Sequence, residues 1–287
     1  MTMRHIPTPS AQGAIRILVI NPNTSTVMTD GLKPILKRLN YSDVEYEYFT
    51  APDEPVTIGG HTFQPISSIN SGEESAQSAL NCWSVLDRIS QFDAFLVACY
   101  SAHPLVGVLR KNIREFEKTH PSTRKKYVTG IFEASVTASL SLISAFDFVT
   151  LGELEKKQVD ESFGIVTTGS IWKEELGKAV TKMLGTSNGS SRFAGVETTG
   201  LTAVELHTTP PEEVKRRIID ATQRLLRESP VPVTAICMGC AGMAGMEEAV
   251  REGCIRGYGE IKGREVRIVD GVVAGVGTLV TSCKAGF

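Results

Sequence analysis

The chain has 287 residues, enough to bury one large core or two modest ones, and a formal net charge of -2. Its basic and acidic residues are intermixed, without a basic stripe or an acidic tail, so the composition argues against nucleic acid or an anionic membrane as partner and favours a small molecule. No segment approaches the roughly 20 apolar residues that span a bilayer, and residues 1–10 lack the apolar stretch of a secretory signal. We therefore expect a cytoplasmic protein with a short disordered N-terminal arm.

Short apolar runs alternate along the chain with longer segments of helical period, which is the pattern of strand–helix units around parallel sheets. The expected strands are Ile15–Ile20, Val44–Phe49, Ala94–Ala98, Tyr127–Ile131, Phe163–Val166, Gly195–Thr198, Val233–Cys237 and Val266–Val269. The expected helices are Thr26–Leu39, Glu73–Ile89, Leu105–Lys118, Trp172–Leu184, Pro211–Glu228 and Val272–Ser282. Polar segments at 51–64, 152–161 and 186–191 predict surface loops. The fold class is α/β.

Two cysteines, Cys99 and Cys240, each end an apolar run and are each followed by small residues. The shared design of strand, cysteine, small residues and helix suggests two similar lobes. Ligands of open α/β sheets bind beyond the carboxyl ends of the strands, where both thiols and Asn23 are expected to lie. Asn23 would there either contact a ligand or simply cap the next helix.

The residues around these two cysteines favour a catalytic role for both thiols. Tyr100, Ser101 and His103 follow Cys99, and a helix that begins near Pro104 would favour its thiolate. Cys240 lies among glycines, which let the backbone approach a ligand closely and leave N–H groups for an oxyanion. Two thiols that face each other across a cleft can remove a proton from one face of a carbon and return one to the other face.

Other roles for cysteine have to be weighed. Cys82, Cys254 and Cys283 lack polar neighbours and are interpreted as small buried residues. Cys237-x-x-Cys240 could be a redox or metal pair, but it supplies only two of the four ligands of a structural zinc site, and strand alternation directs Cys237 toward the core. A nucleophilic pair of Cys99 and His103 stays open.

Six segments in order carry a family resemblance. They are Asn21-Pro-Asn-Thr-Ser25, Pro65-Ile-Ser-Ser-Ile69, Asp93-Ala-Phe-Leu-Val-Ala-Cys99-Tyr, Gly130-Ile-Phe-Glu-Ala134, Gly164-Ile-Val-Thr-Thr168 and Gly239-Cys-Ala-Gly-Met243. With them the chain resembles the Asp/Glu/hydantoin racemase superfamily, especially fungal members of its hydantoin and allantoin racemase branch. The resemblance covers nearly the whole chain.

The resemblance implies two pseudo-symmetric Rossmann-like lobes, each a mostly parallel four-stranded sheet flanked by helices, with the active site in the cleft between them. We expect residues 1–130 plus about 255–287 to form the first lobe and about 131–254 the second. The resemblance also implies no cofactor and no metal, with Cys99 and Cys240 as acid and base. The substrate-binding residues it implies are Asn23, Ser67, Ile69, Tyr100, Ser101, Gly239 and Ala241.

The expected activity is racemisation of a small ureide, allantoin or a 5-substituted hydantoin, by a protein that we expect to be a homo-oligomer. Two alternatives stay open: a cysteine-dependent decarboxylase or isomerase of the same fold, and a ureide-binding protein without catalysis. The second is motivated by Ser101-Ala-His103-Pro-Leu, where bacterial hydantoin racemases commonly carry an acidic residue, Pro and Gly.

Overall fold

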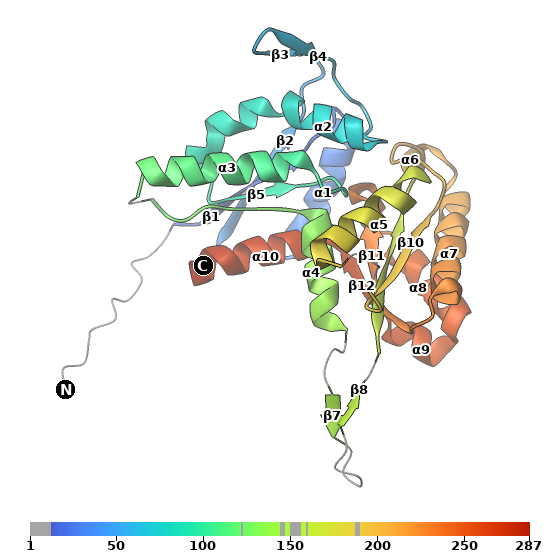
Figure 1. The fold of residues 1–287 in the computed structure, drawn as a ribbon. Coiled ribbons are helices and arrows are strands. Elements are labelled where there is room, and N and C mark those ends of the chain that lie inside the picture. Colours follow the sequence, from blue (N-terminus) through green and yellow to red (C-terminus); the bar gives the residue numbers. More distant parts are fainter. Residues whose placement is uncertain (1–12, 122, 144–146, 150–155, 159, 187–189) are drawn as a thin grey trace, which may run out of the picture.

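The structure is a computed structural model that describes residues 13–121, 123–143, 147–149, 156–158, 160–186 and 190–287. The arm expected at residues 1–10, and residues 152–155 and 159 of the loop expected at 152–161, lie outside the described residues. Two α/β lobes stand side by side (Figure 1). No helix in the described part of the chain has both the length and the apolar character needed to cross a membrane.

Each lobe contains a four-stranded, fully parallel sheet. The first sheet has the order β2-β1-β5-β6, formed by Val44–Thr50, Ile15–Asn21, Ala94–Val97 and Tyr127–Gly130. The second has the order β10-β9-β11-β12, formed by Phe193–Thr198, Ser162–Thr167, Val233–Gly239 and Arg267–Asp270. Counted along the chain, both sheets place their strands in the same order, second, first, third and fourth. The expected α/β fold with two pseudo-symmetric lobes is confirmed.

Helices flank both sheets. Those of the first half are α1 (Thr26–Arg38), α2 (Gly72–Asn81), the 3-10 helix η1 (Trp83–Gln91), α3 (Pro104–Thr119) and α4 (Ile131–Leu142). Those of the second half are α5 (Ile171–Leu184), α6 (Glu205–Thr208), α7 (Pro211–Glu228), the 3-10 helix η2 (Ala241–Met243), α8 (Glu247–Tyr258), α9 (Glu260–Glu265) and α10 (Gly271–Ala285). Two hairpins, β3–β4 (Val56–Ile58, His61–Phe63) and β7–β8 (Asp147–Val149, Lys156–Gln158), extend from the lobes (Figure 1).

The structure corrects several sequence-based expectations. The expected helix over 73–89 is two elements, because α2 ends at Asn81 and a 3-10 helix follows. The loop expected at 51–64 contains the β3–β4 hairpin, whose turn uses the positive φ of Gly59 and Gly60. The helix α4 was not predicted, because it is buried on much of its surface and lacks the polar face that produces a helical period.

The expected lobe boundary is wrong for part of the C-terminal segment, which was assigned to the first lobe from residue 255. The strand β12 pairs with β11, and α8 packs on α7, so the chain belongs to the second lobe as far as Asp270. Only α10 returns to the first sheet, where it packs on β5 and β6. The spacing of apolar residues identifies a strand but does not state which sheet it joins.

Two helices are exchanged between the lobes. α4 leaves the first sheet and packs on β11 and β12, whereas α10 leaves the second sheet and packs on β5 and β6. The helices also pack on each other, and a Cβ on Gly271 would lie 2.7 Å from the carbonyl oxygen of Ile131. This glycine therefore permits a contact that a side chain would block. One continuous apolar core spans both lobes and fixes the cleft between them.

Candidate active site

The residues that follow four equivalent strands converge on one cavity of about 40 Å³. Asn23 follows β1, Cys99 follows β5, Thr168 follows β9 and Cys240 follows β11. The first two belong to one lobe and the last two to the other. Both cysteines thus line a single space between the lobes, with one delivered by each sheet.

Cys99 lies in a pocket of hydroxyl groups. Its Sγ is 3.6 Å from the Ser101 Oγ, which is 3.2 Å from the Ser75 Oγ. Burial raises the pKa of the Cys99 thiol to about 12; the Ser101 hydroxyl opposes this rise, and the Cys240 thiol and the Glu133 carboxylate add to it. The sequence-based expectation of a favoured thiolate is therefore not met, because burial, the largest cause, raises the pKa of this thiol.

His103 caps a helix, α3. Its Nδ1 accepts the N–H of Leu105 at 3.2 Å, and its Nε2 is 2.9 Å from the Ser78 Oγ. Burial lowers the pKa of the imidazole to about 3, so the ring is neutral. Both ring nitrogens have partners other than Cys99, which contradicts the alternative of a Cys99–His103 nucleophilic pair.

Cys240 is surrounded by backbone amides. The N–H of Gly242 donates to its Sγ at 3.3 Å at the start of η2. Burial raises the pKa of the Cys240 thiol to about 11, and hydrogen bonds from the N–H groups of Gly242 and Met243 oppose the rise. These amides supply partial positive charge to the sulfur, so Cys240 carries the less perturbed thiol of the pair.

Asn23 presents a hydrogen-bond donor to the cavity. Its Oδ1 accepts from the Asn21 Nδ2 at 3.0 Å and from the N–H of Ser25 at 2.9 Å. Among the described residues, its Nδ2 donates a hydrogen bond only to the sulfur of Met28, at 3.3 Å, and sulfur is a weak acceptor. Two polar partners therefore hold the amide group in place and leave its N–H₂ available to a carbonyl oxygen in the cavity.

Most of the other residues predicted to bind substrate border this cavity. Ile69, Tyr100, Gly239 and Ala241 line it. The Tyr100 hydroxyl, however, is 2.7 Å from the Ser135 Oγ and directed into the core, so only the remainder of its side chain is available. Ser101 lies behind Cys99 and lines a neighbouring cleft. Ser67 is exposed and lines neither space.

The glycine before Cys240 has a packing role that the sequence did not reveal. A Cβ on Gly239 would lie 2.6 Å from the Thr167 Cβ and 2.8 Å from the Ile165 Cγ2. The Thr167 hydroxyl also donates to the carbonyl oxygen of Gly239. We expected glycine here to leave room for the substrate, but the closer constraint is the contact between β11 and β9.

Sequence reasoning missed several residues of the cavity. They are Met28, Ala98, Thr168, Trp172, Ala203 and Gly242. Thr168 could have been found, because it follows β9 as Asn23 follows β1 in the other lobe. Its hydroxyl has no hydrogen-bond partner among the described residues and so can serve a ligand. Trp172 gave no such signal, since a single aromatic residue early in a helix is usually part of a core.

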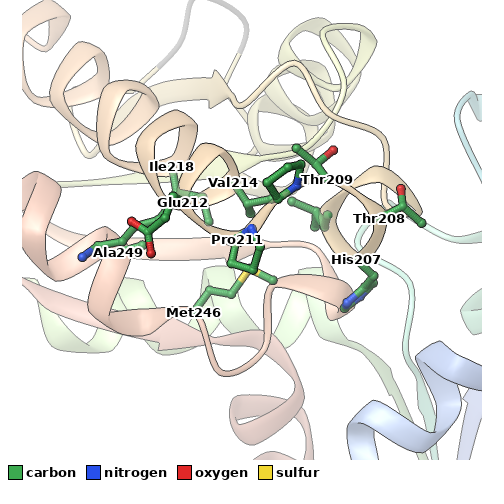
Figure 2. A pocket seen from close by; sticks show the side chains of 12 residues that line it. His207, Thr208, Thr209, Pro211, Glu212, Val214, Ile218, Met246 and Ala249 are labelled. Carbon is green, nitrogen blue, oxygen red and sulfur yellow. The ribbon is translucent and has the colours of Figure 1, made fainter.

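A larger pocket of about 680 Å³ lies beside the Cys240 loop but contains neither of the two thiols (Figure 2). Pro211 and Met246 lie close together in its middle, with His207 at one end (Figure 2). A Cβ on Gly242 would lie 3.2 Å from the His207 Nε2, so the pocket adjoins the loop that bonds Cys240. This pocket is larger than the cavity between the thiols, but the converging polar groups favour the smaller cavity as the active site.

The remaining four cysteines are buried, and all six in the chain are free thiols. Cys237 points into the core, as alternation along the strand predicted, with its Sγ 3.0 Å from the Ser139 Oγ. Within the described ranges, no group of three or more His, Cys, Asp or Glu is arranged to hold a metal ion.

The fold and the site define a two-lobed α/β protein in which equivalent strand ends bring two thiols to one interlobe cavity. The family model for Asp/Glu/hydantoin racemase matches residues 17–279. The chain therefore belongs to the Asp/Glu/hydantoin racemase family, which supports a racemase-type function.

Individual proteins are similar to this chain over most of its length. The chain is 33% identical over 267 residues to the uncharacterized protein C1F7.10 of Schizosaccharomyces pombe, covering 93% of this chain and 91% of that protein. It is 23% identical to the hydantoin racemase of Pseudomonas sp. strain NS671, over 91% of this chain and 83% of the relative. The crystal structure of allantoin racemase from Pseudomonas fluorescens superposes with a TM-score of 0.66 at 23% identity, covering 95% of this chain and 92% of that one.

Proposed function

We propose that this protein racemises a five-membered ureide, allantoin or a 5-substituted hydantoin, by proton transfer between the substrate and the thiols of Cys99 and Cys240. The observation that carries the proposal is that the two thiols come from equivalent strands of opposite lobes and border one cavity. Such a placement can put one sulfur on each face of a single carbon. Metal ions and cofactors have no part in the proposed steps.

The reaction begins with one cysteine as thiolate and the other as thiol. The thiolate takes the proton from C5 of the ring, and the electron pair of the C–H bond passes to the adjacent carbonyl oxygen as an enolate. The second thiol then donates its proton to the opposite face of C5 and becomes the thiolate. The product has the inverted configuration, and the pair holds one proton before and after the reaction. The opposite enantiomer uses the cysteines in reverse.

The polar groups of the cavity suit the charge that develops on oxygen. The Asn23 Nδ2, held by the bonds at its Oδ1, is free to donate to a ring carbonyl. The Thr168 hydroxyl lines the same cavity from the other lobe. Donors fixed in advance around a developing oxyanion typically contribute about 3–4 kcal/mol each to the transition state, because they need no reorganisation during the reaction.

Circular dichroism of enantiopure allantoin and 5-substituted hydantoins in heavy water tests the proposal. We expect the signal to decay to zero, with one solvent deuteron at C5 for each inverted molecule. Release of carbon dioxide from an arylmalonate in a parallel assay, with no decay of the hydantoin signal, would instead identify a decarboxylase. Stable optical rotation together with calorimetric binding would identify a binding protein, and either result would refute racemisation.

A further inference from the structure

The cavity between the thiols is too small for the substrate that the proposed function requires. It holds about 40 Å³, whereas ligand pockets usually hold roughly 300–1,000 Å³. A volume of this size accommodates only a few water molecules. A five-membered ring with a substituent can therefore enter only if a neighbouring space is joined to the cavity.

The structure contains such a space on the other side of one side chain. A cleft of about 260 Å³ lies between α5 of the second lobe and the first turns of α2 and α3 of the first lobe. Trp172 lines both the cavity and the cleft and is 7% exposed. Ser101 also connects them, because it lines the cleft while its Oγ lies 3.6 Å from the Cys99 Sγ. Joined, the two volumes reach the lower end of the usual range.

The cleft offers hydrogen-bonding groups of both kinds. Lys182 brings three N–H donors and has no ion-pair partner in the described part of the chain. Glu175 brings a carboxylate, and its Oε2 lies 3.4 Å from the position of a Cβ on Gly72, so it reaches across to the first lobe. The Ser75 and Ser101 hydroxyls complete the polar lining.

We infer that Trp172 is a movable partition and that the cleft beyond it binds the substituent on C5, selecting a ureido arm over an apolar one. This inference rests on the proposed function. A ureido group presents a carbonyl oxygen, which the Lys182 ammonium can bind, and N–H groups, which the Glu175 carboxylate can accept. An alkyl or aryl arm would displace water from these groups without replacing its hydrogen bonds. Allantoin is the ureide that carries such an arm.

The substrate preference of cleft variants tests whether the cleft binds the ureido arm. Both Glu175 and Lys182 are exposed, so Glu175→Gln and Lys182→Met are compatible with folding. We expect each to lower kcat/KM for allantoin about tenfold and to leave 5-methylhydantoin, whose arm is too short to reach, within twofold. Glu265→Gln and Lys262→Met, exposed on α9 and remote from the cleft, are the matched controls. Equal loss on both substrates, or no loss on allantoin, would overturn the inference.

Tryptophan fluorescence tests whether Trp172 moves on ligand binding, and this measurement does not depend on turnover. The chain has two tryptophans, so Trp83→Phe leaves Trp172 as the only indole. Trp83 lies in η1 and lines neither space. We expect allantoin to change the emission of Trp172, and Lys182→Met to weaken that titration about tenfold while 5-methylhydantoin binding stays unchanged.

The two measurements separate the inference from the proposed function. If the protein binds ligands with this selectivity but does not racemise them, the proposed function is refuted, and the inference that the cleft binds the C5 substituent stands. If the protein racemises allantoin while the emission of Trp172 stays constant, the inference that Trp172 moves is refuted, and the proposed function stands. A protein that neither binds nor racemises allantoin at millimolar concentration would refute both.

Discussion

The two cysteines occupy equivalent places in the two lobes, but their surroundings differ. Cys99 meets side-chain hydroxyls, and the negative charge of Glu133 adds to the burial that raises its pKa to about 12. Cys240 meets backbone N–H groups, and its pKa rises only to about 11. Equivalent topology therefore places the sulfurs, while local contacts decide how readily each one ionises. Cys240 is therefore the thiol whose pKa burial raises less.

The largest effect on activity is expected from removal of either thiol. Cys99→Ser and Cys240→Ser should each lower racemisation at least a thousandfold, because a serine hydroxyl is a far weaker acid and base. The measurement is the decay of the circular dichroism of enantiopure substrate. Each variant retains one thiol and can still exchange the C5 proton of one enantiomer with deuterated solvent.

Cys283→Ser is the matched control, since this buried cysteine packs in the apolar core outside the cavity, and its sulfur has one long hydrogen bond among the described residues, 4.0 Å to the carbonyl oxygen of Asp93. It should retain racemisation within about twofold. Full activity of Cys99→Ser or Cys240→Ser would contradict the scheme of two thiols.

The pH dependence follows from the raised pKa values of both thiols. The thiolate fraction grows as pH rises toward about 11 for Cys240 and about 12 for Cys99. kcat/KM should therefore increase about tenfold per pH unit between pH 6 and 8, after subtraction of the uncatalysed rate. A plateau across this range would show that substrate-free pKa values do not govern the reaction.

The backbone support of Cys240 can be disturbed without removing the sulfur. A Cβ introduced by Gly242→Ala would lie 3.2 Å from the His207 Nε2 and 3.5 Å from the Cys240 Sγ. We expect the crowding to shift the N–H that bonds the sulfur and to lower kcat/KM about tenfold. His207→Ala added to this variant should restore part of the loss, and no restoration would mean that His207 is not the obstacle.

The charge beside Cys99 can be removed separately. The Glu133 Oε2 is buried without a hydrogen-bond partner among the described residues, and burial raises the pKa of this carboxyl group. Glu133→Gln should lower the pKa of Cys99 and accelerate its alkylation by iodoacetamide about threefold, leaving Cys240 unchanged. Peptide mass spectrometry resolves the two sites. Equal acceleration at both would indicate a general loosening of the cavity instead.

His103 should affect stability more than activity. His103→Asn keeps a side chain able to cap α3 and should racemise within about twofold of the unmodified protein. His103→Ala removes the cap and should cost about 1 kcal/mol of unfolding free energy, measured by urea denaturation. A large loss of activity in the asparagine variant, with unchanged stability, would indicate that the imidazole takes part in catalysis.

The sequence determined the parts of this protein that depend on local pattern. Apolar runs located the eight sheet strands to within a few residues, and strand ends followed by Asn23, Cys99 and Cys240 indicated the site, because parallel strands expose their carboxyl ends at one edge. The expected self-association and cytoplasmic location stay predictions.

Only the tertiary structure decided which segments meet. It placed β12 in the second sheet, exchanged α4 and α10 between the lobes, and brought Thr168 and Trp172 to the cavity. It also reversed the expected direction of the Cys99 pKa shift. Contacts between residues distant in sequence, and the desolvation they cause, depend on how the whole chain packs, and no local pattern of residues records them.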